Sequence, residues 1–517
     1  MSRPVVWSIA GTDSGGGAGL SADQRAADAF GVHLCPVVAC VTAQHSRAVR
    51  HVEPLRAELI EAQLQALAED LAPAVIKTGL LGGVEQVRLV ARWVDRLRAQ
   101  GPLALVVDPV LGASTGAGFA DAATLAAYRD ELLPRATVVT PNRGEAQRLL
   151  GGGADTDHSA LPALARALRA RGAQAVCITG GDSADLDGRV LDWIDTEQAC
   201  GWLATQRVPT RHQHGTGCTH ASSLAAALAL GFVPADAAVL AQMATTHALA
   251  HGYAAGQGAG PVQAQRGFAV DPQRLPLLSW GEAPRFAAAG ATPVPGLGLY
   301  AIVDSAERVR QVLDAGVRAV QLRIKSAQAP GLREAARASL AACRAAGAEF
   351  FLNDHVALAR ELGAGLHLGQ QDLLALGETG RAALAGMVLG ISTHSLWELC
   401  RARALAPRYL ACGPVWPTLT KAMPWIPQGL DNLAWWCRMA QRPVVAIGGI
   451  LRAEQVQAAA RCGADGVCVV RALGNDPAAA VPALRQALAA GRAQPTSAVP
   501  DLPHASLVST PQARGER

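Results

Sequence analysis

The first half of the chain contains glycine-rich and polar segments whose residue types suit phosphoryl transfer. Residues 11–19 have the sequence Gly-Thr-Asp-Ser-Gly-Gly-Gly-Ala-Gly and follow an apolar, strand-like run. A glycine-rich turn between a strand and a helix lets the backbone approach a ligand closely. This turn is not a P-loop, because no Gly-Lys-Ser/Thr follows it. Asp23, on the helix expected next, could accept hydrogen bonds from an amino heterocycle or be an ordinary surface or capping carboxylate.

A second segment, His-Gly-Thr-Gly-Cys at residues 214–218, precedes a long helical pattern. Glycines at a helix N-terminus expose backbone N–H groups to an anion, and such groups stabilise a transferring phosphoryl. Cys218 would gain thiolate character from the helix dipole and could then accept a hydroxyl proton as a general base. A small buried cysteine that merely starts a helix is the alternative.

A third segment, Thr-Pro-Asn-Arg-Gly-Glu at residues 140–145, places Asn142 and Glu145 three residues apart. This spacing suits a network of water molecules between a metal ion and a phosphate. A capped helix start explains the same spacing equally well.

In the second half, polar residues cluster directly after short apolar runs. The runs cover residues 299–303, 319–324, 349–352, 365–368, 388–391, 409–412, 443–447 and 466–470. The polar residues are Gln321, Arg323, Lys325, Asn353, Asp354, residues 370–372, Ser392, residues 418–421, Gly448 and Gly449. Eight such runs alternating with helical segments predict a (β/α)8 TIM barrel, in which these positions all meet at the rim that holds active sites.

The residue types on this rim suit the binding of pyrophosphate. Asp354 and Asp372 form a pair of carboxylates of the kind that binds Mg²⁺, which bridges to substrate phosphates. Three cations would surround the pyrophosphate: Arg323, Lys325 and Lys421. The chain has only three lysines in all, Lys77 being the other, so each lysine is a candidate site residue.

Composition and patterning set the outline of the fold. The chain has 517 residues, 50% of them apolar and 17% charged, which excludes disorder over its whole length. Residues 1–270 alternate apolar runs with helical segments, which predicts an α/β domain with a mostly parallel sheet. Residues 271–295 are expected to be a linker, residues 296–490 the barrel and residues 491–517 a disordered tail.

Charge and cysteine usage argue against a nucleic-acid-binding protein and against a disulfide-bonded secreted protein. The net charge of +4 gives no sign of nucleic-acid binding. No signal peptide or membrane span is expected, and the 11 scattered cysteines, none in a Cys-x-x-Cys pair, predict reduced thiols in the cytoplasm.

Taken together and in order, the motifs of residues 3–265 resemble the ribokinase-like superfamily, and within it hydroxymethylpyrimidine/phosphomethylpyrimidine kinase. Further matching motifs are Thr-Ala-Gln at 42–44, Ile-Lys-Thr-Gly at 76–79 and Asp-Pro-Val at 108–110. The resemblance implies that Asp23 and Gln44 bind the aminopyrimidine and that Cys218 is the base. It also implies an anion hole and a site for Mg²⁺ and the co-substrate ATP. The anion hole would be formed by Gly215, Thr216 and Gly217, and the Mg²⁺ site by Asn142 and Glu145. Thr179 stands where the family often has lysine, which leaves the relative rates of the two phosphorylations open.

Residues 297–475 resemble thiamine-phosphate synthase. The matching motifs include Val-Gln-Leu-Arg-x-Lys at 320–325, Gly-x-His-Leu-Gly-Gln-x-Asp at 365–372 and Gly-Pro-Val-x-Pro-Thr-x-Thr-Lys at 413–421. The resemblance implies that Asp354 and Asp372 are the metal ligands. The pyrimidine diphosphate would be bound by Gln321, Arg323, Lys325, Asn353, Ser392 and Lys421. The thiazole phosphate would be bound by Thr418, Thr420, Gly448 and Gly449.

The product of the first enzyme is the substrate of the second, so the chain is expected to be a fusion of two steps of thiamin biosynthesis. Small molecules are its expected partners, and a homo-oligomer is expected. Two alternatives stay open. The kinase half could act on a pyridoxal-like alcohol, or one half could be catalytically silent and act as a thiamin-phosphate sensor or scaffold.

Overall fold

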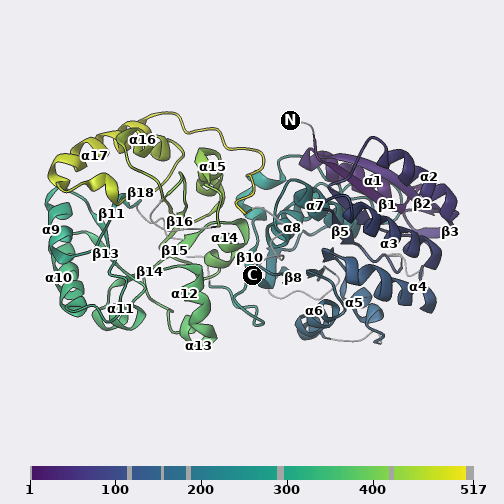
Figure 1. The fold of residues 1–517 in the computed structure, drawn as a ribbon, viewed down its shortest axis with the longest axis horizontal. Coiled ribbons are helices and arrows are strands. Elements are labelled where there is room, and N and C mark those ends of the chain that lie inside the picture. The colour runs from purple at the N-terminus through teal and green to yellow at the C-terminus, as the bar shows by residue number, and fades with distance from the viewer. Residues whose placement is uncertain are drawn as a thin grey trace. The chain divides into compact units, whose positions relative to one another are not determined.

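The computed structural model describes residues 3–112, 119–152, 157–181, 188–287, 296–418 and 424–507. The chain divides into two compact units, residues 1–284 and residues 285–507. Each unit is an α/β structure, as the sequence predicts, and each is described separately below (Figure 1).

Unit 1 is built on a ten-stranded mixed sheet with the order β10-β9-β8-β7-β6-β5-β4-β1-β2-β3. The strands are β1 (Val5–Gly11), β2 (His33–His45), β3 (Ala48–Pro54), β4 (Val75–Thr78), β5 (Ala104–Val107), β6 (Val138–Val139), β7 (Val176–Ile178), β8 (Arg189–Asp195), β9 (Cys200–Gln206) and β10 (Leu277–Leu278). The six central strands, from β7 to β2, pair in parallel, and antiparallel strands extend both edges. The carboxyl ends of the parallel strands therefore meet at one edge of the sheet, where ligands bind in open α/β folds.

Helices cover this sheet. They are α1 (Gly19–Phe30), α2 (Ala57–Ala68), α3 (Val84–Arg98), α4 (Ala122–Ala127), α5 (Arg143–Leu149), α6 (Leu161–Ala170), α7 (Thr216–Ala229) and α8 (Pro234–Ala250), with short helices η1 (Tyr128–Leu132), η2 (Leu133–Arg135), η3 (His158–Ala160), η4 (Phe268–Val270) and η5 (Pro272–Arg274). α7 packs against α1 and α8, whereas α3 packs against α2 and α4. Nearly all of α8 is buried, as expected for a helix that is apolar on all sides.

The predicted linker is partly wrong, because residues 271–284 belong to unit 1. Leu277 and Leu278 form β10, which pairs antiparallel with β9 at the edge of the sheet. The Ser279 hydroxyl accepts a hydrogen bond of 2.8 Å from the Trp202 backbone N–H. The prolines of this segment lie beside an edge strand, where a missing N–H donor is tolerated.

Unit 2 is a closed barrel of eight parallel strands, with β18 pairing back to β11. The strands are β11 (Gly298–Val303), β12 (Ala319–Leu322), β13 (Glu349–Asn353), β14 (Gly365–Leu368), β15 (Leu389–Thr393), β16 (Tyr409–Cys412), β17 (Val444–Ala446) and β18 (Gly466–Val469). All eight lie on the apolar runs from which the barrel is predicted. The TIM barrel is therefore confirmed, and its polar rim lies at the carboxyl ends of the strands.

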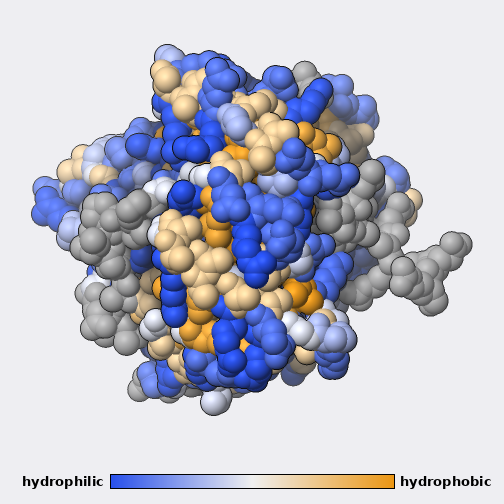
Figure 2. Space-filling model, turned by 90° about the vertical axis from the view of Figure 1, so that its left-hand side faces the viewer, coloured by the Kyte–Doolittle hydropathy of each residue, from blue (hydrophilic) through white to orange (hydrophobic). Residues whose placement is uncertain are grey.

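The outer helices of unit 2 are α9 (Ala306–Asp314), α10 (Leu332–Ala345), α11 (Val356–Leu362), α12 (Gln370–Ala375), α13 (Gly377–Ala382), α14 (Leu396–Arg403), α15 (Gly429–Met439), α16 (Ala453–Arg461) and α17 (Pro477–Ala493), with the short helix η6 (Arg471–Leu473). In α9, Val309, Val312 and Leu313 face the barrel. Figure 2 shows the resulting outer face, on which hydrophilic residues are mixed with scattered hydrophobic ones.

The prediction of a disordered tail from residue 491 is wrong as far as residue 507. Residues 491–493 complete α17, and residues 494–507 pack against unit 2. Ser506 is buried there, and the His504 backbone N–H donates to Asn432 Oδ1 at 2.9 Å. These contacts are made to residues distant in the chain, so composition alone does not predict them.

No helix among the described residues is long and apolar enough to cross a membrane.

Candidate active sites

A cavity of about 710 Å³ opens at the carboxyl edge of the sheet in unit 1. Most of the residues predicted for the kinase site line it: Gln44, Asn142, Glu145, Gly215, Thr216, Gly217 and Cys218. β2, α5 and α7 supply these side chains, so three separate motifs of the sequence converge on one space.

The start of α7 is shaped by close packing between two glycine-containing loops. Gly215, the N-cap of α7, has a φ of 84°, and a Cβ atom there would lie 2.2 Å from the Gly17 carbonyl oxygen. The Thr216 hydroxyl donates to the Gln213 carbonyl at 2.6 Å. Because the first N–H groups of a helix have no partner within the helix, this end of α7 can bind an anion.

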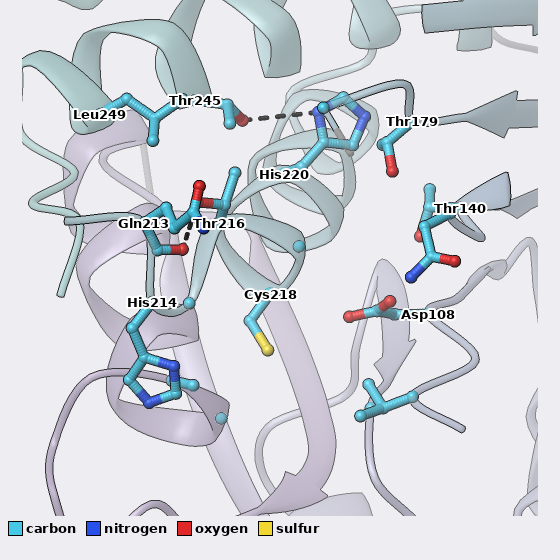
Figure 3. Close-up of a pocket in the computed structure, with 18 of the residues that line it drawn as sticks. Asp108, Thr140, Thr179, Gln213, His214, Thr216, Cys218, His220, Thr245 and Leu249 are labelled. Atoms are coloured by element: carbon cyan, nitrogen blue, oxygen red, sulfur yellow. Dashed lines mark hydrogen bonds between the residues drawn. The ribbon is translucent and has the colours of Figure 1, made fainter. Parts of the chain in front are cut away.

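Cys218 lies in the first turn of α7. In Figure 3 its sulfur and the Asp108 carboxylate, which follows β5, project into the same part of the cavity. Burial raises the pKa of the Cys218 thiol to about 12, although the nearby Lys77 ammonium opposes this shift. Desolvation outweighs the opposing effect of Lys77, so the pKa shifts in the direction opposite to that expected for a thiolate.

Asp23 does not line this cavity, so its predicted contact with the aminopyrimidine has to be corrected. Its side chain is fully buried and accepts hydrogen bonds from Lys77 Nζ (2.9 and 3.1 Å), Ser8 Oγ (2.6 Å) and Ser222 Oγ (2.7 Å). Both carboxylate oxygens are thus occupied within the protein, and Asp23 acts as the counter-ion of Lys77.

Lys77 is fully buried between two carboxylates. Its ammonium lies 2.9 Å from Asp23 and 3.7 Å from Asp108. Burial by itself lowers the pKa of Lys77, but the two carboxylates raise it above its usual value overall. Burial raises the pKa of Asp108 to about 6, against the opposing effect of Lys77. Lys77 therefore stays charged, and it lines the cavity together with Cys218.

Sequence reasoning missed Asp13, which organises the glycine-rich turn. Its carboxylate accepts from the backbone N–H groups of Gly15 (2.8 Å), Gly17 (3.0 Å) and Ala18 (2.8 Å), and from His214 Nε2 at 2.8 Å. Burial raises the pKa of Asp13, but these hydrogen bonds lower it overall. An aspartate two residues before a glycine is a known turn signal that could have identified this role.

These contacts change the interpretation of the turn at residues 11–19. Three of its N–H groups bind the Asp13 carboxylate, so they are not free for a ligand. His214 in turn lies 3.3 Å from Gln44 Nε2, which connects the turn to the predicted pyrimidine contact.

Asn142 and Glu145 form a capping box at the start of α5. The Glu145 N–H donates to Asn142 Oδ1 at 2.9 Å, and the Asn142 N–H donates to Glu145 Oε2 at 2.9 Å. The helix-start interpretation is thus confirmed, yet both side chains also line the cavity. Asp108 Oδ2 is buried there without a hydrogen-bond partner among the described residues. Together these residues present the oxygen donors that suit Mg²⁺.

The cavity wall formed by β8 and α7 contains two further titratable groups. Burial raises the pKa of Asp192 to about 7, while its bond from the Gly180 N–H (2.8 Å) opposes the shift. Burial lowers the pKa of His220 to about 4, so this ring is neutral at pH 7. Thr179 also lines the cavity, where the family often has lysine.

In unit 2 the predicted residues lie at the carboxyl ends of the barrel strands. Gln321 lies in β12, with Arg323 and Lys325 just after it, Asn353 ends β13, and Ser392 lies in β15. Thr418 follows β16, and Gly448 and Gly449 follow β17. Thr420 and Lys421 lie outside the described residues.

The two predicted metal ligands follow neighbouring strands, β13 and β14. Asp354 follows β13 with a φ of 66°, and Asp372 lies in the first turn of α12, where it accepts from the Gly369 N–H at 2.9 Å. Burial raises the pKa of Asp354, the Asp372 charge raises it further, and Arg323 opposes this. Two carboxylates that repel each other are stabilised by a divalent cation, so the donor set fits Mg²⁺. Among the described residues no group of three or more His, Cys, Asp or Glu side chains could hold a metal.

The turn after β17 packs closely against the loop after β16. Gly448 and Gly449 have φ values of 94° and 70°, and a Cβ on either would approach Pro414 or Trp416 within 2.7 Å. The Trp416 N–H donates to the Gly448 carbonyl at 3.1 Å. The rim segments that are predicted to hold the thiazole phosphate therefore support each other.

A chain of hydrogen bonds crosses the barrel interior and ends at the rim, and sequence reasoning missed most of it. Gln321 Nε2 donates to Tyr300 Oη (2.9 Å), which lies 2.7 Å from Tyr409 Oη. His367 bridges Tyr409 Oη (2.7 Å) and Ser392 Oγ (3.0 Å), and burial lowers the pKa of its ring to about 4. Gln321 Oε1 is buried without a partner among the described residues.

The comparisons with known proteins match each of the two units. A family model described as phosphomethylpyrimidine kinase matches residues 13–263, and one described as thiamine monophosphate synthase matches residues 299–473. A probable chloroplastic thiamine biosynthetic bifunctional enzyme of Oryza sativa subsp. japonica is 34% identical over 92% of this chain and 87% of its own length. The chloroplastic thiamine biosynthetic bifunctional enzyme of Arabidopsis thaliana is 33% identical over 86% of this chain and 85% of its own.

Other proteins are similar in sequence to the first half of the chain. A hydroxymethylpyrimidine/phosphomethylpyrimidine kinase of Synechococcus elongatus is 42% identical over 51% of this chain and 97% of its own. A solved pyridoxal kinase of Staphylococcus aureus in complex with AMP-PCP and pyridoxal is 29% identical over 51% of this chain and 94% of its own, with a TM-score of 0.46.

The fold and the two sites define an enzyme of two phosphate-handling units, a ribokinase-like kinase followed by a TIM-barrel transferase. The two plant relatives match this chain along both units, and these matches identify its family. The chain belongs to the thiamine biosynthetic bifunctional enzymes, which combine a hydroxymethylpyrimidine/phosphomethylpyrimidine kinase with a thiamine-phosphate synthase. Both resemblances noted from the motifs are therefore confirmed.

Proposed function

We propose that unit 1 uses ATP to phosphorylate 4-amino-5-hydroxymethyl-2-methylpyrimidine and then its monophosphate. Unit 2 then couples the resulting diphosphate to 4-methyl-5-(2-phosphoethyl)thiazole, with release of pyrophosphate. The observation that carries this proposal is the convergence of separate motifs at one cavity in unit 1 and one rim in unit 2.

In unit 1 we assign roles from the position of each group. The N–H groups of Gly215, Thr216 and Gly217 stabilise the transferring phosphoryl. Gln44 contacts the pyrimidine, and the His214 ring lies beside its amide, 3.3 Å from Nε2. Asn142 and Glu145, with Asp108, would hold Mg²⁺, which supplies positive charge to the phosphates of ATP.

Cys218 is the proposed base of the kinase. Its pKa of about 12 means that it is a neutral thiol before the substrate binds. To act as the base, the thiol first gives its proton to solvent, and the charge of the nearby Lys77 ammonium, which lowers this pKa, stabilises the thiolate. The proton of the substrate hydroxyl then passes to this thiolate while the oxygen attacks the γ-phosphorus of ATP, and the bond to the bridging oxygen breaks so that ADP leaves.

In unit 2 the roles follow from the charges on the rim. Arg323 and Lys325, together with Lys421, bind the pyrophosphate of the pyrimidine diphosphate. Ser392 and Asn353 complete this binding site, and Gln321 contacts the aminopyrimidine through its unpaired Oε1. Asp354 and Asp372 would hold Mg²⁺, which neutralises charge on the leaving pyrophosphate.

The reaction then needs mainly positioning and leaving-group stabilisation. The bond between the pyrimidine methylene carbon and the pyrophosphate oxygen breaks, and the bonding electrons leave with pyrophosphate. The electron-rich aminopyrimidine stabilises the carbocation, and the thiazole nitrogen forms the new C–N bond. Thr418, Thr420, Gly448 and Gly449 bind the thiazole phosphate.

A one-pot reaction tests the proposal. The purified chain is mixed with the hydroxymethylpyrimidine, ATP, Mg²⁺ and the thiazole phosphate, and thiamine phosphate is detected as fluorescent thiochrome. Cys218→Ala and Asp372→Ala are run in parallel, each also with supplied pyrimidine diphosphate. We expect each variant to lose at least 100-fold from the one-pot rate and the diphosphate to rescue only Cys218→Ala.

Two further arms address the alternatives. Pyridoxal in place of the hydroxymethylpyrimidine should be phosphorylated more slowly; faster turnover would overturn the assigned kinase substrate. No thiamine phosphate from the folded wild-type chain, even with supplied diphosphate, would overturn the synthase and support a sensor or scaffold role. A cytoplasmic location and a homo-oligomer stay predictions, and the two plant relatives are described as chloroplastic.

A further inference from the structure

The segment after α17, residues 494–507, is held to unit 2 along its length. In Figure 1 it is the yellow chain that leaves α17 and passes α16 and α15. The Ser497 N–H donates to the Arg461 carbonyl at 3.0 Å, and Arg461 Nε donates to the Pro495 carbonyl at 3.2 Å. Further on, Pro503 and Ser506 are buried.

His504 fixes this segment to the start of α15. Its backbone exchanges two hydrogen bonds with the buried Asn432 side chain, of 2.9 Å and 3.0 Å. Its ring Nε2 lies 2.9 Å from the Gln428 carbonyl oxygen. Two residues on, the Ser506 carbonyl accepts from the Ile426 N–H at 2.8 Å.

Gln428 connects this anchor to the synthase rim. Its N–H donates to the Pro414 carbonyl (2.8 Å), and its side-chain Nε2 donates to the His394 carbonyl (2.6 Å). Pro414 lies in the loop after β16 that leads to Thr418, and His394 lies two residues after Ser392. One fully buried side chain thus joins two rim segments to the C-terminal segment.

We infer that residues 494–507 are a positioning element of the synthase, and that His504 is the positioning residue through which they hold Gln428 and residues 413–418 of the loop after β16. The inference rests on the proposed placement of both phosphorylated substrates at this rim. His504 touches no proposed substrate site, so it acts through Gln428.

The expected kinetic effect follows from this arrangement. Without the segment, the loop after β16 spends only a fraction of its time in the binding-competent arrangement. The apparent KM of each substrate then rises by the inverse of that fraction. Saturating substrate restores the arrangement, so kcat changes little. General destabilisation would instead reduce the amount of active enzyme, which lowers kcat and leaves KM unchanged.

The test uses the full chain, a chain ending at residue 493, and the variants His504→Ala, His504→Gln and Asp501→Ala. Asp501 is an exposed residue of the same segment and provides the matched control. For each protein we measure synthase KM and kcat with the pyrimidine diphosphate and the thiazole phosphate, the melting temperature, and the kinase rate of unit 1.

We expect the truncated chain to show KM values at least tenfold higher, with kcat within twofold and an unchanged kinase rate. His504→Ala should raise KM about threefold, and His504→Gln, which keeps a side-chain N–H donor, should restore part of it. Asp501→Ala should match the wild type. A synthetic peptide of residues 494–507 added to the truncated chain should lower KM again.

Wild-type KM values in both the truncated chain and His504→Ala would overturn the inference. So would a lowered kcat with unchanged KM and a lower melting temperature, which is the signature of a purely structural role. If the truncated chain does not fold, His504→Ala alone decides between these outcomes. If the wild-type chain makes no thiamine phosphate, the proposed function is overturned together with the inference. If the wild-type chain makes it and the variants show no rise in KM, only the inference is overturned.

Discussion

Single residues in this chain show how burial decides the chemistry of a charged group. Lys77 is one of only three lysines, and it lies fully buried between Asp23 and Asp108. Removing one partner of such an ion pair leaves an uncompensated buried charge, which costs about 3–5 kcal/mol. Lysine also fits this place because its ammonium is compact, whereas the guanidinium of arginine is broad and planar.

A buried carboxylate without a cation beside it behaves differently. Burial raises the pKa of Asp192 from 3.8 to about 7, so between these values the unfolded chain binds fewer protons than the folded one. The free energy of unfolding therefore falls as the pH rises from about 4 to 7. Asp192→Asn removes this loss and can still accept the hydrogen bond from the Gly180 N–H.

We therefore expect Asp192→Asn to raise the melting temperature of unit 1 by several degrees at pH 8. This shift corresponds to a gain of about 1–2 kcal/mol in the free energy of unfolding. Near pH 4 the melting temperature should be unchanged. Thermal unfolding at both pH values checks this, and the transition that ATP shifts identifies unit 1. Asp130→Asn, at an exposed carboxylate of the same unit, is the control. An equal shift at both pH values would mean that proton binding is not the cause.

At the scale of elements, the kinase site depends on two loops that meet. The turn before α1 and the start of α7 are far apart in the sequence, yet Gly17 and Gly215 touch through their backbones. The Asp13–His214 hydrogen bond of 2.8 Å crosses the same junction. This junction orients the first turn of α7, and with it Cys218.

Gly215→Ala tests this junction, because the new Cβ would lie 2.2 Å from the Gly17 carbonyl and the φ of 84° disfavours alanine. Gly101→Ala, in the same unit and outside the cavity, is the control, since its Cβ meets nothing within 4 Å. We expect Gly215→Ala to lower the melting temperature of unit 1 and reduce the kinase rate at least tenfold. Gly101→Ala should lower neither by more than a small amount. Equal losses in both variants would contradict the role of the junction.

At the scale of the whole molecule, two units with separate cores carry consecutive reactions. A linker confers proximity and no fixed path between sites. The pyrimidine diphosphate is therefore expected to leave unit 1 into solution before it reaches unit 2.

Mixing two inactive chains tests this expectation. Cys218→Ala retains the synthase and Asp372→Ala retains the kinase, so a mixture should make thiamine phosphate from the hydroxymethylpyrimidine after a lag. Thiochrome fluorescence follows the time course, and each variant alone is the control. The expectation would be contradicted if the mixture made no thiamine phosphate while Cys218→Ala remained active on supplied diphosphate. The intermediate would then pass only within one chain.

Much of the architecture and many of the site residues were predictable from the sequence. Strand positions follow from short apolar runs, because a buried parallel strand needs a continuous apolar segment. The residues that follow each run must then meet at one edge or rim, as Asp108 after β5 and Asn142 after β6 do in unit 1. The sequence by itself thus determined the two folds and the two reactions.

Only the tertiary structure decided which groups pair and which protonation state they hold. Lys77 and Asp23 are 54 residues apart, Tyr300 and Tyr409 are 109 apart, and Asp13 and His214 are 201 apart. No local pattern specifies such pairs. The pKa of Cys218 likewise depends on burial by residues from distant parts of the chain, which no local pattern specifies either. For the same reason the segment at residues 494–507, polar and without periodicity, resembles a disordered tail until its partners on α15 and α16 are known.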